Sequence, residues 1–409
     1  MNFNPFFLLS VTGPQVLLVT SLSCSVELFY HLLPPSARVI SATSVASGEE
    51  YGEGSANAAY PYRANRAPRA LGFAHSGEEK DFGYRAMHGS VELGKAMTEE
   101  YYGRKISYSY YSGASTGGRQ GLKEAMISPN SFNGLLIGAP AWKSSGSATD
   151  WMVRGTAYPS ACLTPSQALT VQNIYSDFVA EGRFAFPGME LSSESQWNFL
   201  VGGASPMSFG DAYIQYFLYD DPSWHWTQWH DSIVWQADEA DPGNCTADDY
   251  NMAQLRERGG KVLMYHGLAD ALIPPRSSIL FYERVAEAMG GVESVQEWFR
   301  LFMVPGLQHV TGTAVDAPWY FAGAGSHGRL GTATFSTPGF EDARHDALLA
   351  LMAWVENGTA VSELVATTWK KSADASSGVL RQRPLCPFPK RQNYLGAGDP
   401  DVAESFGCV

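Results

Sequence analysis

Residues 110–122 read YYSGASTGGRQGL, and this stretch decides the fold. Gly113 to Gly117 match G-x-S-x-G, the pattern of a serine held on a sharp turn between a strand and a helix. The chain has 41 glycines, so the pattern alone is weak and its flanks must decide. The aromatic, alternating run before it (106–112) predicts a strand, and LKEAMI (122–127) predicts a helix. Ser115 is therefore a candidate nucleophile rather than part of a simple glycine-rich turn.

The same order of elements recurs on either side. Buried strands are predicted at NGLLIGAPA (133–141), KVLMYHGLAD (261–270) and EWFRLFMVPGLQH (297–309). Helices are predicted at 81–103, ending on Gly103, at 277–291, and at 342–358. Strands that alternate with helices indicate an α/β fold with a mostly parallel sheet.

The middle of the chain differs from both flanks. Residues 143–241 are rich in aromatics and show no strong strand alternation, which indicates an inserted lid between core parts 26–142 and 242–409. Lids of this kind wall substrate pockets, although the tryptophans here more often form the core of the lid itself. These tryptophans are Trp224, Trp226, Trp229 and Trp235. Residues 41–67 are predicted to be a loop or linker.

Charge and cysteine content exclude several classes of protein. The net charge of −13 and the absence of any basic run argue against nucleic-acid binding. No C-x-x-C pair or Cys/His cluster has zinc-site spacing. Cys386 and Cys408 lie close together in a Pro-rich C-terminal tail that we expect to be irregular, and a disulfide between them is plausible in an oxidising compartment, although spacing cannot prove it.

The N-terminal segment 1–25 is apolar and resembles a secretory signal, but it lacks a basic start and contains Gly13 and Pro14. A buried strand or an imperfect gene start are the alternatives. The sequons at Asn244 and Asn357 would be glycosylated only in a secreted chain. No other apolar run is long enough to span a bilayer, so we expect no stable membrane association.

A serine nucleophile needs a histidine base and a carboxylate that orients it, in the chain order Ser, Asp, His for this fold. Asp270 ends the 261–270 run and His309 ends the 297–309 run, so Ser115, Asp270 and His309 have the required order. Taken singly, Asp270 could be a turn residue and His309 a loop residue. The competing histidines suit the role less well, because we expect His345 inside a helix, His266 within a strand, and His225 and His230 in the insertion.

With these residues the chain resembles the tannase and feruloyl esterase family of α/β-hydrolases. The matching runs include DFGYRAMH (81–88), YSGASTGGRQGL (111–122), RGGKVLMYHGLADALIPP (258–275), RLFMVPGLQH (300–309) and RPLCPFPK (383–390). The resemblance implies Ser115 as nucleophile, His309 as base and then acid, Asp270 as its orienting carboxylate and the Thr116 N–H as an oxyanion donor. It also implies a secreted hydrolase that acts on esters of aromatic acids. We expect no cofactor in this chain.

The chain departs from the family pattern in three places. The family's disulfide between the residue before the serine and the residue after the histidine is replaced by Ala114 and Val310. The lid stretch 149–167 lacks the repeated aspartates of the family's calcium site, so we expect no calcium there. Cys162 lacks the neighbouring lid cysteines of the family, so we expect it to be free. The glycine-rich loop for a second oxyanion donor is not recognisable, and Gly48, Gly52 and Gly54 are poor substitutes.

Three functions remain open from the sequence. The first is a serine esterase that acts on feruloyl, galloyl or related aromatic esters. The second is a catalytically impaired relative that keeps an aromatic-ligand pocket, as the lost disulfide and glycine loop suggest. The third is an esterase of small-molecule biosynthesis with the same machinery.

Overall fold

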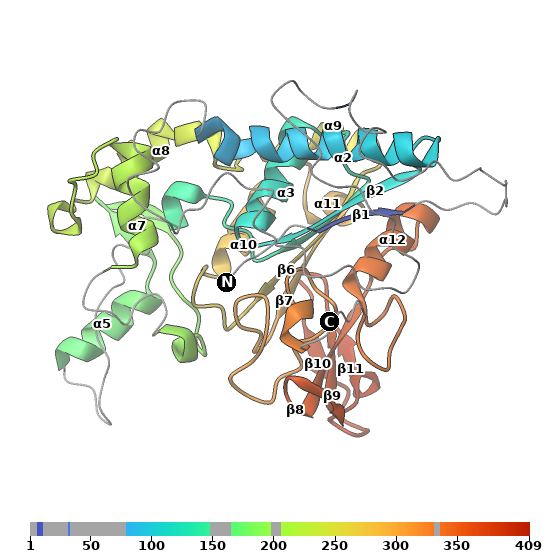
Figure 1. Ribbon diagram of the computed structural model, residues 1–409. Coiled ribbons are helices and arrows are strands. Elements are labelled where there is room, and N and C mark those ends of the chain that lie inside the picture. Colours follow the sequence, from blue (N-terminus) through green and yellow to red (C-terminus); the bar gives the residue numbers. More distant parts are fainter. Residues whose placement is uncertain (1–5, 11–31, 33–78, 148–164, 198–205, 331–335) are drawn as a thin grey trace.

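The computed structural model describes residues 6–10, 32, 79–147, 165–197, 206–330 and 336–409. Its centre is a five-stranded sheet of order β1-β2-β3-β6-β7. Strands β2, β3, β6 and β7 run parallel, whereas β1 pairs antiparallel with β2. The bounds are β1 Phe6–Ser10, β2 Tyr108–Ala114, β3 Gly134–Gly138, β6 Lys261–Gly267 and β7 Phe299–Val304. The predicted α/β class with a mostly parallel sheet is confirmed (Figure 1).

Successive side chains along each strand point to opposite faces of the sheet, and each face packs against its own hydrophobic core. Tyr110, Leu136 and Leu263 pack with α12 (Ala347–Asn357) on one face. Their chain neighbours on the other face pack with α2 (Ala86–Tyr102), α3 (Thr116–Ile127) and α10 (Arg276–Ala288). Short helices α9 (Ala253–Glu257) and α11 (Val292–Gln296) precede β6 and β7. The sheet is thus buried between helical layers, as near-continuous apolar strands require.

Two helix ends test the sequence predictions. Helix α2 ends at Gly103, whose φ of 61° gives the predicted left-handed cap, and a π-helical turn at Asp81–Arg85 precedes the helix. Helix α12 begins later than predicted, because the Asp346 side chain accepts hydrogen bonds from the N–H groups of Leu348 and Leu349 and caps the helix there. His345 therefore lies before the helix, and its predicted place inside it is wrong.

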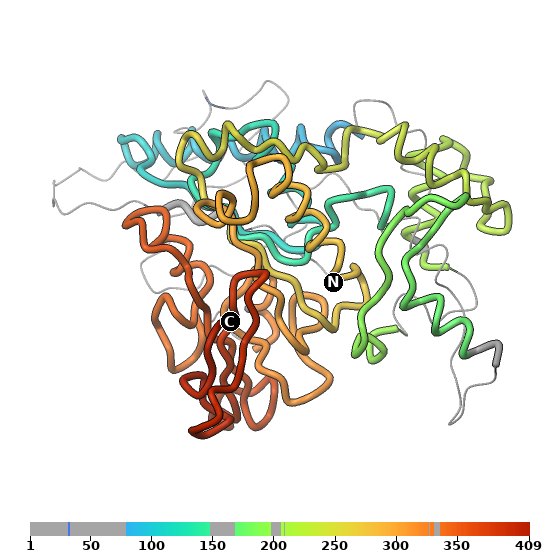
Figure 2. The backbone as a smooth tube through the Cα atoms, turned by 180° about the vertical axis from the view of Figure 1, so that it is seen from behind, coloured from blue at the N-terminus to red at the C-terminus, as the bar shows by residue number. Residues whose placement is uncertain are grey.

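The lid lies on the opposite side of the core from α12 (Figures 1 and 2). Its helices are α5 (Pro165–Tyr175), α7 (Ser208–Ala212), continued by a π-helix at Tyr213–Leu218, and α8 (Ser232–Ala240). It also contains a hairpin of β4 (Phe178–Ala180) and β5 (Arg183–Phe186), which are too short to show alternation in sequence. Trp224 is buried with Ile214 and Ile233, against which Trp226 and Trp229 pack, so these tryptophans form a core within the lid.

The C-terminal part is more regular than the sequence suggests. An antiparallel hairpin joins β8 (Leu364–Lys371) and β9 (Asp374–Leu385), and β10 (Gln392–Tyr394) pairs with β11 (Phe406–Cys408). Cys386 and Cys408 form a disulfide with a Cα–Cα distance of 5.5 Å. The expected irregular tail is therefore wrong, because strand pairing orders it as well as the disulfide.

Several predictions fall on residues outside the described ranges. These include the 41–67 linker and most of the 1–25 segment, of which only Phe6–Ser10 is described, as an edge strand. Cys24 and Cys162 also lie outside. Within the described part of the chain, no helix has the length and apolar character needed to cross a bilayer.

Candidate active site

Ser115 lies between β2 and α3 in a strained backbone conformation. Its φ of 59° and ψ of −121° are rarely adopted by residues other than glycine and cost about 1 to 3 kcal/mol. Hydrogen bonds hold this geometry: the Ser115 N–H donates to the Gly138 carbonyl at 2.9 Å, and the N–H of Ala141 donates to the Ser115 carbonyl at 3.1 Å. The end of β3 thus fixes the turn, as expected for a serine presented at the edge of the sheet.

Some of the glycines around Ser115 are sterically required and one is not. A Cβ on Gly113 would lie 2.6 Å from the Tyr111 hydroxyl, and one on Gly118 would lie 2.9 Å from the Gly138 carbonyl oxygen. A Cβ on Gly117 would meet only the Tyr111 hydroxyl, at an ordinary 3.7 Å. Gly113 and Gly118 are therefore required for space, whereas Gly117, the second glycine of the pattern, is not.

Asp270 is fully buried in the loop after β6, and all of its hydrogen-bond partners are donors. Its Oδ1 accepts from the N–H groups of Leu272 (2.7 Å) and Ile273 (3.1 Å). Its Oδ2 contacts Nδ1 of His309 at 2.7 Å and Nε2 of His266 at 3.0 Å. Burial opposes ionisation, but the two rings, His309 foremost, hold the pKa of Asp270 well below its usual value. The carboxylate is therefore ionised and rigidly held.

His309 lies in the loop after β7 and is only 4 % exposed. With Nδ1 donating to Asp270, Nε2 becomes the atom that can take up a proton. The lid supports this loop: the Gln196 side-chain oxygen accepts hydrogen bonds from the backbone N–H groups of His309 (3.2 Å) and Ala271 (3.5 Å). One lid side chain therefore joins the loops that carry Asp270 and His309.

Gly267 allows these two loops to approach each other. A Cβ on Gly267 would lie 2.2 Å from the Leu307 carbonyl oxygen and 2.6 Å from that of Gln308. The Ala269 N–H also donates to the Leu307 carbonyl at 2.9 Å. Close backbone contact between the two loops thus sets the distance from Asp270 to His309.

Sequence reasoning missed two supporting residues, His266 and Gln196. His266 was set aside because it lies within a strand, yet its ring reaches the carboxylate four residues later. The i,i+4 spacing of His266 and Asp270 in the 261–270 run was the only available signal. Gln196 lies 113 residues before His309, and nothing in the sequence marks this contact.

The predicted nucleophile, base and acid lie at one edge of the sheet. Ser115 follows β2, Asp270 follows β6 and His309 follows β7, and these strands are parallel, so their carboxyl ends meet at the same edge. Thr116 is the first residue of α3, where backbone N–H groups have no partner within the helix and the helix dipole favours negative charge. The glycines 48, 52 and 54 lie outside the described residues.

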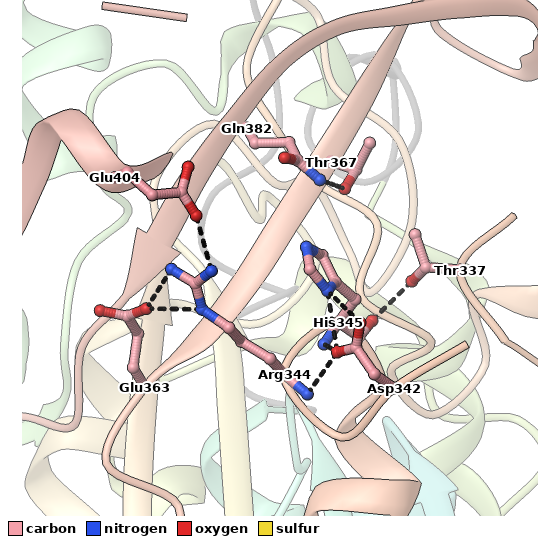
Figure 3. Close-up of polar contacts among 8 residues, drawn as sticks. All are labelled: Thr337, Asp342, Arg344, His345, Glu363, Thr367, Gln382 and Glu404. Carbon is pink, nitrogen blue, oxygen red and sulfur yellow. Dashed lines mark hydrogen bonds and ion pairs between the residues drawn. The ribbon is translucent and has the colours of Figure 1, made fainter. Parts of the chain in front are cut away.

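The other candidate histidines have structural contacts elsewhere. Nδ1 of His345 contacts the Asp342 carboxylate at 2.9 Å and 3.0 Å, beside the Arg344 ion pairs with Glu363 and Glu404 (Figure 3). In the lid, Nδ1 of His225 contacts the Thr227 hydroxyl and that of His230 contacts the Ser232 hydroxyl. None of these contacts involves Ser115 or Asp270.

Ala114 and Val310 occupy the positions of the family's cysteine pair, and both are buried in the same hydrophobic cluster. Val310 has a φ of 54°, an unfavourable conformation for a β-branched residue. Apolar packing therefore stands where the family resemblance predicts a crosslink. The remaining cysteine of the described residues, Cys245, is a buried free thiol whose pKa is raised by burial to about 11.

Among the described residues, no group of three or more His, Cys, Asp or Glu side chains could hold a metal ion. The lid stretch for which we expected no calcium lies almost entirely outside them. A pocket of about 220 Å³ lies where the lid meets the core and is lined by Lys143, Asp238 and Arg284 among others, but not by Ser115 or His309. An ion pair of 2.8 Å between Lys143 and Asp238 joins the beginning and the end of the lid segment there.

The chain is similar to one family of known proteins. The family model described as "Tannase and feruloyl esterase" matches residues 35–158 and 231–409. The chain is 30% identical to "Probable feruloyl esterase B-2" of Aspergillus fumigatus over 396 residues, which covers 82% of this chain and 73% of the relative. It is also 30% identical to "Probable feruloyl esterase B-1" of Neosartorya fischeri, with 81% of this chain and 71% of the relative covered.

Solved structures show the same fold. The crystal structure of feruloyl esterase B from Aspergillus oryzae superposes with a TM-score of 0.73 at 25% identity, over 82% of this chain and 76% of that one. The tannin acyl hydrolase from Aspergillus niger has a TM-score of 0.61 at 19% identity, over 83% and 72%. The family model covers both core parts of the chain and leaves most of the lid unmatched. The chain therefore belongs to the tannase and feruloyl esterase family of α/β-hydrolases, a family of carboxylic ester hydrolases.

Proposed function

We propose that this protein is a serine carboxylic-ester hydrolase that cleaves esters of aromatic, phenolic acids, such as feruloyl or galloyl esters, through an acyl-enzyme. The observation that carries the proposal is the buried Asp270–His309 pair, at 2.7 Å, on the same sheet edge as the strained Ser115 turn. A carboxylate that fixes the histidine tautomer is what a serine nucleophile needs.

In the proposed reaction, Nε2 of His309 takes the hydroxyl proton of Ser115 while Oγ attacks the ester carbonyl carbon. The Thr116 N–H, at the start of α3, stabilises the developing oxyanion. The tetrahedral intermediate collapses, the C–O bond to the alcohol breaks, and His309 returns the proton to the leaving oxygen. Water, deprotonated by His309, then hydrolyses the acyl-enzyme. Asp270 stays ionised throughout and stabilises the imidazolium.

The substrate class rests on similarity. The relatives at 30% identity bear the name feruloyl esterase, which favours esters of hydroxycinnamic acids for this chain as well. The family model leaves most of the lid unmatched, and lids of this kind wall substrate pockets. The acyl group that this chain accepts therefore needs a direct test.

A substrate panel tests the proposal. Purified protein is assayed with ferulate, gallate and simple acyl esters, with Ser115→Ala as control, and is labelled with a fluorophosphonate followed by peptide mapping. We expect label on Ser115, and turnover of aromatic esters reduced at least about 10³-fold in the variant. Absence of label together with turnover that survives Ser115→Ala would rule the proposal out.

A second function, an aromatic-ligand pocket without turnover, is favoured by one observation: Ala114 and Val310 replace the crosslink between the two catalytic loops. Calorimetry with ferulic acid separates the two functions. Binding without Ser115-dependent hydrolysis supports the second, and turnover at ordinary enzyme rates excludes it. An esterase of small-molecule biosynthesis would use the same site residues. In the substrate panel it would then turn over aromatic esters of biosynthetic origin in preference to the others.

We further propose that the chain is secreted. The Cys386–Cys408 disulfide supports this, since such bonds persist in oxidising compartments. Both sequon asparagines are exposed, but the two residues after Asn357, at the end of α12, are exposed as well. The two residues after Asn244 are buried, and the side-chain oxygen of Asn244 accepts a hydrogen bond from Lys123 at 2.7 Å. Expression in a secretory host should place a glycan on Asn357 and not on Asn244, as peptide mass spectrometry would detect. An unmodified Asn357 in the secreted protein would contradict the predicted glycosylation.

A further inference from the structure

His266 is a second imidazole on the carboxylate of the candidate triad. It lies on β6 and is fully buried. Its Nε2 is 3.0 Å from Asp270 Oδ2, the same oxygen that Nδ1 of His309 contacts at 2.7 Å. Two rings therefore share one carboxylate oxygen, an arrangement that exceeds the needs of a serine, histidine and aspartate triad.

The contacts of His266 determine which of its nitrogens carries hydrogen. Nε2 also lies 3.0 Å from the Ile273 carbonyl oxygen. A carbonyl and an ionised carboxylate can only accept, so Nε2 must carry the hydrogen and donate it. Nδ1 lies 2.7 Å from the Ser278 hydroxyl at the start of α10. In the neutral ring, the Ser278 hydroxyl donates to Nδ1.

The Ser278 hydroxyl therefore donates to Nδ1 of His266, and Nε2 of His266 donates to Oδ2 of Asp270. The same Oδ2 also accepts from Nδ1 of His309. The titratable groups that the described contacts place against His266 are Asp270 and, through it, His309. A donor on Oδ2 withdraws negative charge that would otherwise stabilise the protonated ring of His309. It also helps to hold the carboxylate in the orientation set by the N–H groups of Leu272 and Ile273.

We propose that His266 is a positioning residue that donates to Asp270 Oδ2 and weakens the hold of that carboxylate on the proton of His309. His309 then loses its proton at a lower pH than it would beside Asp270 alone, and the hydrolase stays active in more acidic solution. This rests on the proposed function for its effect on turnover, but the coupling between the two rings is a property of the folded protein.

The test compares three variants. His266→Leu removes the donor, and His266→Gln keeps an N–H donor without a titrating ring. His345→Leu is the matched control, since that histidine is also buried but its Nδ1 pairs with the carboxylate of Asp342 and not with that of Asp270 (Figure 3). Two readouts are used: the pH profile of kcat/KM for an aromatic ester, and NMR titration of ¹⁵N-labelled histidine rings, which reports on His309 with or without turnover.

We expect His266→Leu to move the acidic limb of kcat/KM, and the His309 titration midpoint, to higher pH by about 1 unit. His266→Gln and His345→Leu should leave both near the wild-type position. An unmoved His309 midpoint in folded His266→Leu, or an equal movement in His345→Leu, would overturn the proposal. A moved midpoint without Ser115-dependent turnover in any variant would instead reject the proposed function and leave this inference standing.

If His266→Leu does not fold, Ser278→Ala replaces it. That change keeps the imidazole and removes the hydroxyl that holds Nδ1, so the donor to Asp270 becomes less well fixed. The midpoint should move in the same direction by a smaller amount. A midpoint identical to that of the wild type would overturn the proposal.

Discussion

At the scale of single residues, the site depends on how many donors converge on Asp270. Its two oxygens have four described partners, two from the backbone and two from imidazoles. Such a carboxylate cannot easily rotate or take up a proton, so it keeps His309 in one tautomer. The serine is held firmly as well, because its backbone hydrogen bonds come from the end of β3, from Ala141 just after that strand and from the first turn of α3.

Asp270→Asn tests the orienting role of the carboxylate. An amide NH₂ in place of Oδ2 would face the Nδ1–H of His309, so the ring would adopt the wrong tautomer. We expect kcat to fall by about 10⁴-fold, with KM nearly unchanged, in steady-state assays. Asp342→Asn, at the exposed partner of His345, should retain wild-type kcat. A kcat for Asp270→Asn within tenfold of wild type would contradict the assignment.

Asp270 also links stability to pH. Because its pKa in the folded protein lies below the ordinary carboxyl value of about 4, the unfolded chain binds this proton more readily on acidification. Its stabilising contribution is therefore fully present above about pH 4 and is lost as pH falls further. Urea unfolding of wild type and Asp270→Asn should show a stability difference that shrinks below pH 4. A difference in unfolding free energy that does not change with pH would contradict the predicted loss of stabilisation below pH 4.

Gly267→Ala tests the close contact between the two catalytic loops. The new Cβ would lie 2.2 Å from the Leu307 carbonyl oxygen, so the His309 loop must move. We expect a loss of about 1 to 3 kcal/mol in unfolding free energy, together with a lower kcat. The control is Gly89→Ala on α2, where a Cβ meets nothing within 4 Å. It should stabilise the protein by up to about 1 kcal/mol and leave kcat unchanged.

At the scale of elements, the lid segment supports the two loops that carry Asp270 and His309. The 3₁₀ turn Glu194–Gln196 contacts both catalytic loops through Gln196, and the Ser195 hydroxyl accepts a hydrogen bond from Gln308 at 2.8 Å. This turn reaches the base from outside the core. A shift of the lid is therefore expected to alter the position of His309 directly.

Gln196→Ala tests this support. The variant lacks the side-chain oxygen that accepts hydrogen bonds from both loops. We expect this loss to raise the activation free energy by about 1 kcal/mol, which corresponds to a five- to tenfold lower kcat/KM, with most of the change in kcat. Gln236→Ala, which removes an exposed lid contact with Tyr219, is the matched control and should behave as wild type. Equal effects of the two changes on kcat would show that the lid does not position His309.

At the scale of the whole molecule, the sequence indicated the core well and the contacts across it poorly. Strands β3, β6 and β7 were predictable because each is a continuous apolar run followed by a turn, and β2 was predictable from its alternating aromatic residues. Asp270 and His309 could be proposed because each ends such a run. The β4–β5 hairpin is too short to show a period, and the partners of His266 and Gln196 depend on how separate loops meet in space.

Ala114→Cys with Val310→Cys tests whether the family's crosslink can be restored. Both positions lie in one buried cluster, and the bond would close a loop of about 200 residues, worth as much as about 5 kcal/mol in the chain-entropy model. We expect a disulfide by non-reducing mass spectrometry and a melting temperature that falls when dithiothreitol is added. The single variant Ala114→Cys should show no such dependence. Two free thiols in the folded double variant would contradict the prediction.

The gap in the family match has a practical consequence. The family model leaves residues 159–230 unmatched, yet this segment contains Gln196, whose amide reaches the backbone beside His309. The contact uses the main-chain N–H groups of Ala271 and His309, so it does not depend on the side chains of the core. A lid of different sequence could therefore hold these loops if it keeps one side-chain acceptor at the same place. Chimeras that graft the lid of a relative onto this core should be designed around that amide, so that substrate range changes while the catalytic machinery stays intact.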